Sequence, residues 1–99
     1  MGRQVILAPA AHADIEAIMH YTVGRWVNAQ WEKYKATLDK IIFSIAAKPE
    51  GGSRKRGMSA TVLSRRAARH VVFYIVDEKI IPILRILHER MDFRRHTMQ

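Results

Sequence analysis

Residues 70–87, HVVFYIVDEKIIPILRIL, form the stretch that decides the predicted fold. Its two halves, 70–76 and 80–87, are rich in β-branched and aromatic residues, and they flank the polar triplet Asp77-Glu78-Lys79. Two such runs separated by a short polar segment are typical of paired β-strands. Because proline cannot donate a ladder hydrogen bond, we expect a bulge or an open side at Pro82 in the second strand.

Two shorter strands are expected on the N-terminal side of this pair. Thr61-Val62-Leu63 leads into Arg65 and Arg66, after a loop over 50–59 that is rich in glycine, serine and basic residues. Much earlier in the chain, Val5-Ile6-Leu7 is a short apolar run that stops before Pro9. Both runs have the composition and the length of strands.

The segment between these strands has helical periodicity. Pro9 suits the first turn of a helix, Asn28 can cap a second helix, and Pro49 ends it because a residue that precedes proline avoids the α region. Each helix carries one apolar stripe. The stripes consist of Ile15, Ile18, Met19, Thr22 and Trp26 in the first helix, and of Trp31, Tyr34, Leu38, Ile41, Ile42 and Ile45 in the second. The predicted order is β-α-α-β-β-β, an α+β fold with a helical hairpin on one face of a mainly antiparallel sheet.

Length and composition limit the classes of protein that are possible. With 99 residues we expect a single domain over 1–99, in which 88–99 form a basic C-terminal tail. The chain has no cysteine, which excludes disulfide scaffolds, zinc ribbons and thiol nucleophiles. The longest stretch without charge, 4–13, is too short to span a bilayer. We therefore predict a cytoplasmic protein that makes no membrane contact.

Charge gives the first indication of function. The chain has 17 Lys and Arg against 9 Asp and Glu, a net charge of +8. Residues 50–99 carry 11 basic and 5 acidic side chains, whereas 1–49 carry 6 and 4. The positive charge is thus concentrated in the predicted sheet and the tail. Such a field favours an acidic protein or a polyanion as partner, and it leaves direct binding of nucleic acid open.

Several short strings resemble the ParE/RelE superfamily of toxin–antitoxin toxins, most closely its ParE branch. They are Leu7-Ala8-Pro9, Asp14-Ile15, Arg69-His70-Val71-Val72-Phe73-Tyr74, Arg85-Ile86-Leu87-His88, Arg90-Met91-Asp92 and His96. Two positions depart from the family pattern, Ala8 where Ser or Thr is frequent, and Ala68 where glycine is common. Because glycine accepts the positive φ of a tight hairpin, we expect a longer or bulged turn around 67–68.

The resemblance implies a bacterial toxin that a ParD-like antitoxin holds inactive, in a complex of one copy each or a hetero-tetramer of two copies each. ParE-like toxins are inhibitors of DNA gyrase, whereas RelE-like relatives cut mRNA in the ribosome. The two branches share one fold, so the fold alone cannot choose between them. A non-toxic, degenerate binding module is a third possibility. No cofactor is implied.

Ribonuclease chemistry requires a proton acceptor, a proton donor and cations around the phosphate. His88 is the titratable candidate near the end of the sheet. The candidate cations are Arg54, Lys55, Arg56, Arg65 and Arg85. Residues 89–99 contain no tyrosine, whereas RelE-like nucleases commonly place a catalytic aromatic residue there. We therefore favour an inhibitor without catalytic residues over an endoribonuclease.

Some of these residues also have structural interpretations. His88 is expected to bond a backbone carbonyl or Asp92 and so to fix the tail. The spacing of His88, Asp92 and His96 would suit a metal on a helix, but the arginines around them oppose a cation, and we predict no metal site. Trp26, Trp31 and Tyr34 are expected to pack the two helices together.

The residues expected to bind the antitoxin or the target lie on a helix-free face of the sheet and in the tail. Arginine suits this role because its planar guanidinium binds carboxylates and phosphates in a bidentate manner. The candidates are Arg65, Arg66, Arg69, Arg85, His88, Arg90, Met91, Asp92, Arg94 and Arg95.

Overall fold

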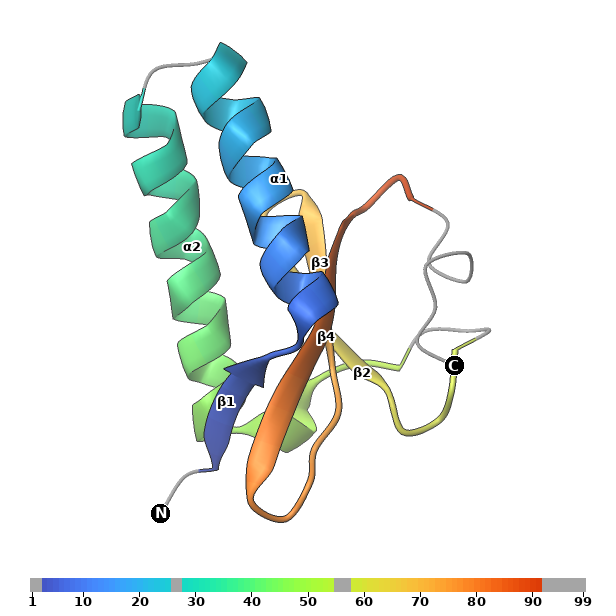
Figure 1. Ribbon diagram of the computed structural model, residues 1–99. Helices are drawn as coiled ribbons and strands as arrows, with labels where there is room; N and C mark the ends of the chain where they lie inside the picture. The colour runs from blue at the N-terminus through green and yellow to red at the C-terminus, as the bar shows by residue number, and fades with distance from the viewer. Residues whose placement is uncertain (1–2, 26–27, 55–57, 92–99) are drawn as a thin grey trace.

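A computed structural model describes residues 3–25, 28–54 and 58–91, without the side chains of 21–25 and 28. Two helices and four strands follow one another in the predicted order (Figure 1). The elements are β1 (Gln4–Leu7), α1 (Pro9–Arg25), α2 (Asn28–Ala47), the 3₁₀ turn η1 (Pro49–Gly51), β2 (Leu63–Ala67), β3 (His70–Tyr74) and β4 (Ile80–His88). The first helix begins at Pro9 and the second ends just before Lys48-Pro49, both as predicted.

The four strands form one sheet in the order β1-β4-β3-β2. β4 pairs with β3 and β3 with β2 in antiparallel fashion, whereas β1 joins β4 in parallel. The sheet is therefore mixed and mainly antiparallel, which confirms the predicted α+β class. The irregularity expected at Pro82 occurs slightly later: Phe73 pairs with Arg85 and Tyr74 with Ile83, so Leu84 is the extra residue of a bulge.

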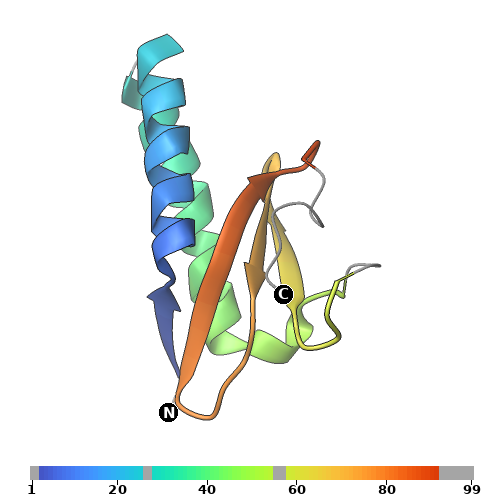
Figure 2. The same cartoon turned by 45° about the vertical axis from the view of Figure 1, so that its right-hand side comes forward.

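Both helices lie on the same face of the sheet (Figure 2). Their stripes meet the sheet as predicted, since Leu38 and Ile45 are buried and Ile15 and Ile18 pack on the same core. Thr22 and Trp26, the last members of the first stripe, lie outside the described side chains. The main core combines these helical residues with Val72, Tyr74, Ile81, Ile83 and Ile86 of the sheet.

A second, smaller core covers part of the opposite face. Successive strand residues point to opposite faces, so Val71 and Phe73 turn away from the helices while Val72 and Tyr74 face them. Val62 and Met58, from the chain that precedes β2, pack on this second cluster. The face away from the helices is thus partly apolar and partly covered, rather than a bare surface of arginines.

The β2–β3 connection is tight, contrary to the expectation of a longer or bulged turn. Only Ala68 and Arg69 separate the two strands, whose residues pair in register from Leu63–Tyr74 to Ala67–His70. Ala68 adopts the conformation that glycine would normally supply, with φ of 55°. The left-handed region costs an L-residue about 1–2 kcal/mol, so the pairing of the strands overrides a local preference.

None of the helices in the described segments combines the length and the apolar character needed to cross a bilayer.

Candidate partner-binding site at the end of the sheet

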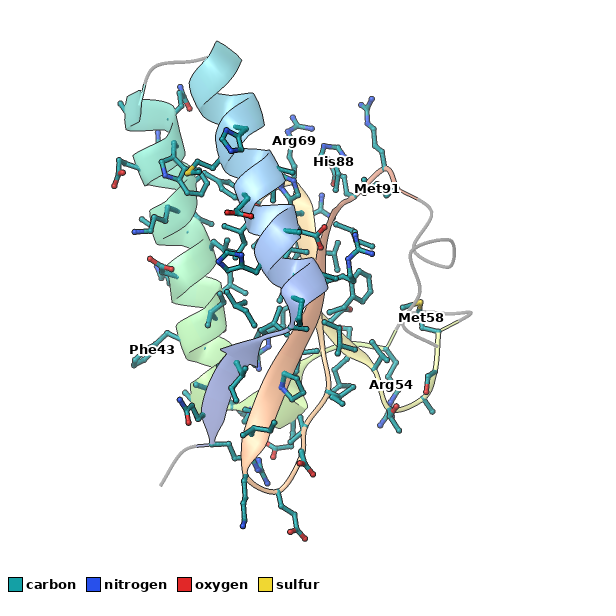
Figure 3. All side chains as sticks on the ribbon, in the orientation of Figure 1. Phe43, Arg54, Met58, Arg69, His88 and Met91 are labelled. Carbon is teal, nitrogen blue, oxygen red and sulfur yellow. The ribbon has the colours of Figure 1, made fainter. Side chains whose placement is uncertain are left out.

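The β2–β3 turn and the end of β4 meet at one end of the molecule, where Arg69, His88 and Met91 lie close together (Figure 3). Glu89 follows β4 and receives hydrogen bonds from two arginines of the turn. Its Oε1 accepts from Arg66, and its Oε2 lies 3.4 Å from Nη1 of Arg69. The Glu89 side chain is only 22% exposed, whereas those of Arg66 and Arg69 are 63% and 74% exposed. A half-buried carboxylate therefore orients two guanidinium groups that solvent and partners can reach.

Glu89 was missed as a site residue. No acidic residue is close to Arg66 or Arg69 in the sequence, and Glu89 is 20 positions beyond Arg69. The pairing of β3 with β4 places His70 opposite His88 and so brings Glu89 beside the turn. The predicted pairing of the two strands within 70–87 was the available signal, but the sequence analysis did not predict the register that places His70 opposite His88.

Arg65 lies on the other face, which corrects its predicted place on the helix-free face. It alternates with Arg66 along β2 and pairs with Val72, so its side chain points toward α2. Its Nη1 donates to Oγ of Ser44 at 2.8 Å, and its Nη2 donates to the carbonyl of Lys48. Arg65 therefore ties β2 to the end of α2 instead of facing a partner.

Arg85 is likewise engaged within the fold. Its Nε and Nη2 donate to the two carboxylate oxygens of Asp14 in α1, at 2.8 and 2.9 Å. The same carboxylate accepts the backbone N–H of Ile86 at 2.9 Å, at the edge of β4 beyond the last β1 pair, Leu7–Ile83. Hydrogen bonding to Asp14 raises the pKa of Arg85 despite partial burial.

The role of Asp14 was also missed, because in the sequence it was singled out only as part of the Asp14-Ile15 string. Asp14 lies beyond the first turn of α1, which contains no acidic residue. Its spacing gives the signal: Asp14 stands three residues after buried Ala11 and four before Ile18, so it shares the face of the apolar stripe. An acid on that face needs a partner from the sheet.

His88 fixes the turn that follows β4. Its Nδ1 accepts the backbone N–H of Arg90 at 3.1 Å, and its carbonyl accepts the N–H of Met91 at 2.9 Å. The predicted structural role is thus present, but with a backbone N–H rather than a carbonyl as partner. Asp92, the alternative partner of His88, lies outside the described residues, as do His96, Arg94 and Arg95. Within the described ranges, no three His, Asp or Glu side chains gather as a metal site would require.

Aromatic rings connect α2 with this end of the sheet. Tyr34 lies 6.3 Å from Trp31 and 5.2 Å from His70, measured between ring centroids, and it packs on the main core. Burial raises the pKa of the Tyr34 phenol far above its usual value. Tyr34 thus packs α2 onto the sheet, and Trp31 contacts Tyr34 within α2. That these rings pack the two helices together stays a prediction, and Trp26 lies outside the described residues.

Three large apolar side chains are exposed on the described part of the surface. Met91 at the candidate site is 42% exposed, Ile6 in the edge strand β1 is 40% exposed, and Phe43 on the outer side of α2 is 77% exposed. Arg90, between Glu89 and Met91, is exposed as well. The end of the sheet therefore offers Arg66, Arg69 and Arg90 together with an apolar side chain, a combination suited to an acidic and partly apolar partner.

The fold is of one class with that of solved structures of the RelE and ParE type, small α+β proteins. The chromosomal ParDE TA system from P. aeruginosa matches with a TM-score of 0.74 at 18% identity, over 87% of this chain and 95% of that one. The toxin–antitoxin complex RelBE2 from Mycobacterium tuberculosis matches with a TM-score of 0.63 at 21% identity, over 89% and 99%. At these identities the likeness establishes the fold.

Sequence comparison identifies the family. Residues 5–93 match the family described as "ParE toxin of type II toxin-antitoxin system, parDE". Toxin ParE1 of Mycobacterium tuberculosis is 34% identical over 97 residues, 97% of this chain and 99% of that protein. Toxin ParE1 of Caulobacter vibrioides is 33% identical over 90 residues, 91% and 93% of the two chains. The chain belongs to the ParE toxin family of type II toxin–antitoxin systems.

Proposed function

We propose that this protein arrests growth by binding DNA gyrase, that it catalyses no reaction itself, and that a ParD-like antitoxin neutralises it in the cytoplasm. Membership of the ParE family supports a toxin of the inhibitor type. The exposed end of the sheet, with Arg66, Arg69, Arg90 and Met91, is the surface we assign to partner binding.

One observation favours binding over RNA cleavage: Arg65, Arg85 and His88, three of the residues that a nuclease would use, are engaged in holding the fold. Of the other candidate cations, Arg54 is exposed, and Lys55 and Arg56 lie outside the described residues. Arg85 is bonded to Asp14, and Arg65 is bonded to Ser44 and Lys48. His88, the candidate acid–base group, uses Nδ1 to accept a backbone N–H. Moving these groups toward a phosphate would break contacts between α1, α2 and the sheet. The cations that stay exposed are better placed to bind a partner's surface.

Charge and surface chemistry support an acidic antitoxin. The net charge of +8 attracts an anionic chain, and a disordered segment can fold as it binds. The related solved structures are of ParDE and RelBE2 toxin–antitoxin systems. β1 is an edge strand, so its outer side is a candidate for an added strand, and Phe43 on α2 could bind an apolar side chain. We propose a complex of one copy each or a 2:2 hetero-tetramer.

The gyrase proposal is tested with purified components. The wild-type protein is added to gyrase and relaxed plasmid, and inhibition of supercoiling is titrated. The Arg66→Ala/Arg69→Ala variant removes two exposed cations and should weaken inhibition at least about tenfold, because charged contacts at an interface contribute several kcal/mol. Lys33→Ala/Lys35→Ala removes the same charge from exposed positions on α2 and should inhibit like the wild type.

Two results would contradict this proposal. An equal loss of gyrase inhibition in both variants would show that inhibition depends on the overall charge and not on the end of the sheet. Undiminished supercoiling together with codon-positioned cuts in ribosome-bound mRNA would instead identify a ribonuclease.

The antitoxin is tested separately by co-expression with the neighbouring open reading frame. We expect the two proteins to co-purify at a fixed ratio, and mass determination then distinguishes the 1:1 from the 2:2 complex. A protein that elutes alone and does not affect growth would argue against the proposal and in favour of a non-toxic module.

A further inference from the structure

Three rings connect the helical hairpin to the candidate site. Tyr34 of α2 lies with its ring 5.2 Å from that of His70 in β3, and His70 lies 5.3 Å from His88 in β4. Both pairs are arranged edge to face, with interplanar angles of 64° for Tyr34–His70 and 84° for His70–His88. His70 and His88 are direct register partners on the antiparallel strands, so their side chains share one face of the sheet.

The surroundings of His70 disfavour a charged imidazole. Among the described residues, its Nδ1 and the Tyr34 hydroxyl are both buried without a hydrogen-bond partner. Burial and the neighbouring His88 lower the pKa of His70, and the charge of Asp14 only partly opposes this. A proton added to His70 would place a positive charge beneath α2 and beside a second imidazole.

The hydrogen bond at His88 requires that its Nδ1 carry no proton. A backbone N–H can only donate, so the contact between Arg90 N and His88 Nδ1 requires a lone pair on Nδ1. The neutral tautomer that carries its proton on Nε2 satisfies this requirement. Imidazolium carries protons on both nitrogens, so it would set two N–H groups against each other and break this hydrogen bond.

We infer that His70 and His88 form a proton-sensitive contact that controls the shape of the partner-binding end: neutral, they hold the Glu89–Met91 turn on the sheet, and when protonated they release it. The turn carries Glu89, which orients Arg66 and Arg69. Opening it therefore removes the arrangement of the exposed arginines. Mild acid would change the binding surface while the rest of the core stays folded.

The elements packed around His70 bring few charged groups to it. α1 contributes Asp14, whose carboxylate is already bonded to Arg85 and to the N–H of Ile86. α2 contributes the buried Tyr34 phenol, which burial keeps neutral. β2 contributes Ala67, the uncharged register partner of His70, and β4 contributes His88 itself. Among the described residues, Asp14 is the acid whose charge acts on His70, and it is bonded to Arg85. Glu89, next to His88 in the sequence, is bonded to Arg66 and Arg69.

The sign of the pH effect follows from proton uptake. When the contact opens, His70 can bind a proton that the closed form excludes, because its pKa is lowered in the closed form. The closed form is therefore favoured above the ordinary histidine pKa of about 6.5 and is lost as pH falls below it. Below this pKa, the equilibrium constant for opening rises about tenfold for each unit by which the pH falls, for each proton taken up on opening.

The experiment is amide hydrogen exchange of the full chain at Arg90 and Met91 between pH 7.5 and 5.5, corrected for intrinsic exchange. We expect protection at these amides to fall at least about tenfold in the wild type. His88→Asn keeps an acceptor near the Nδ1 position, and His70→Phe keeps a ring. Amide protection in the double variant should therefore fall less than about twofold. His12→Gln/His20→Gln removes two exposed histidines of α1 and should behave like the wild type.

Imidazole ¹⁵N spectra of the wild type test the same inference without any substitution. At pH 7.5 we expect His88 to carry its proton on Nε2. As the pH falls to 5.5, this tautomer and the protection of the Arg90 amide should be lost together. A protection factor that does not change across this range would overturn the inference. A double variant that loses as much protection as the wild type, or a His88 with its proton on Nδ1 at pH 7.5, would overturn it too.

Discussion

At the scale of single residues, Asp14 connects parts of the chain that are 71 and 72 positions apart. Its side chain is 14% exposed and accepts two hydrogen bonds from Arg85 and one from the backbone of Ile86. Arg85 is itself only 23% exposed. A half-buried, bidentate ion pair of this kind is strongly destabilised when one partner is lost, because the other charge is left without compensation.

Asp14→Ala should lower the free energy of unfolding by about 2–4 kcal/mol at pH 7, measured by urea denaturation. Arg85→Ala should cost less in the Asp14→Ala background than in the wild type, because the two substitutions remove one shared interaction. Glu16→Ala, also in α1, breaks a pair with His12 in which both side chains are more than half exposed, and should change stability by less than about 0.5 kcal/mol. Additive effects of the Asp14 and Arg85 substitutions would refute the coupling.

At the scale of elements, the sequence predicts most of the fold. Pro9 and Lys48-Pro49 mark helix ends, and the apolar stripes predict which helical faces meet the sheet. The faces of the strands were harder to predict. The orientation of Arg65 depends on the exact alternation along β2, and a shift of one residue exchanges the two faces. The contacts of Glu89 and Asp14 depend on pairing between distant segments, which local patterns do not encode.

The β2–β3 turn gives a prediction about backbone conformation. Ala68→Gly should stabilise the protein by about 0.5–1 kcal/mol, since glycine adopts φ of 55° without a steric penalty, although it adds some entropy to the unfolded chain. The adjacent Ala67→Gly makes the same chemical change in a buried strand residue and should destabilise by about 1 kcal/mol. Thermal unfolding of both variants checks this, and a lower melting temperature for Ala68→Gly would contradict it.

Helix α2 has two faces with different roles. Ile45 is fully buried in the main core, whereas Phe43, two positions earlier, is 77% exposed. Ile45→Ala should cost about 2–5 kcal/mol in urea denaturation because it leaves a cavity. Phe43→Ala should change stability by less than about 0.5 kcal/mol, as expected of a surface position. A large loss of stability in Phe43→Ala would show that the ring packs within the fold.

At the scale of the whole molecule, the chain combines a compact fold with a strong positive charge and one end that presents arginines. The contacts of Arg65 and Arg85 unite both helices with the sheet, so the cations that hold the fold are distinct from those that face solvent. Members of the RelE and ParE class share this architecture, and the assignment to gyrase therefore depends on the surface and the family rather than on the fold.

The most direct test is to induce the chain without its antitoxin and to measure plasmid topology and mRNA integrity in the same culture. Gyrase inhibition predicts loss of negative supercoiling and accumulation of gyrase-linked DNA breaks before translation declines, with ribosome-bound mRNA intact. Codon-positioned mRNA cuts on plasmids that stay fully supercoiled would contradict this account.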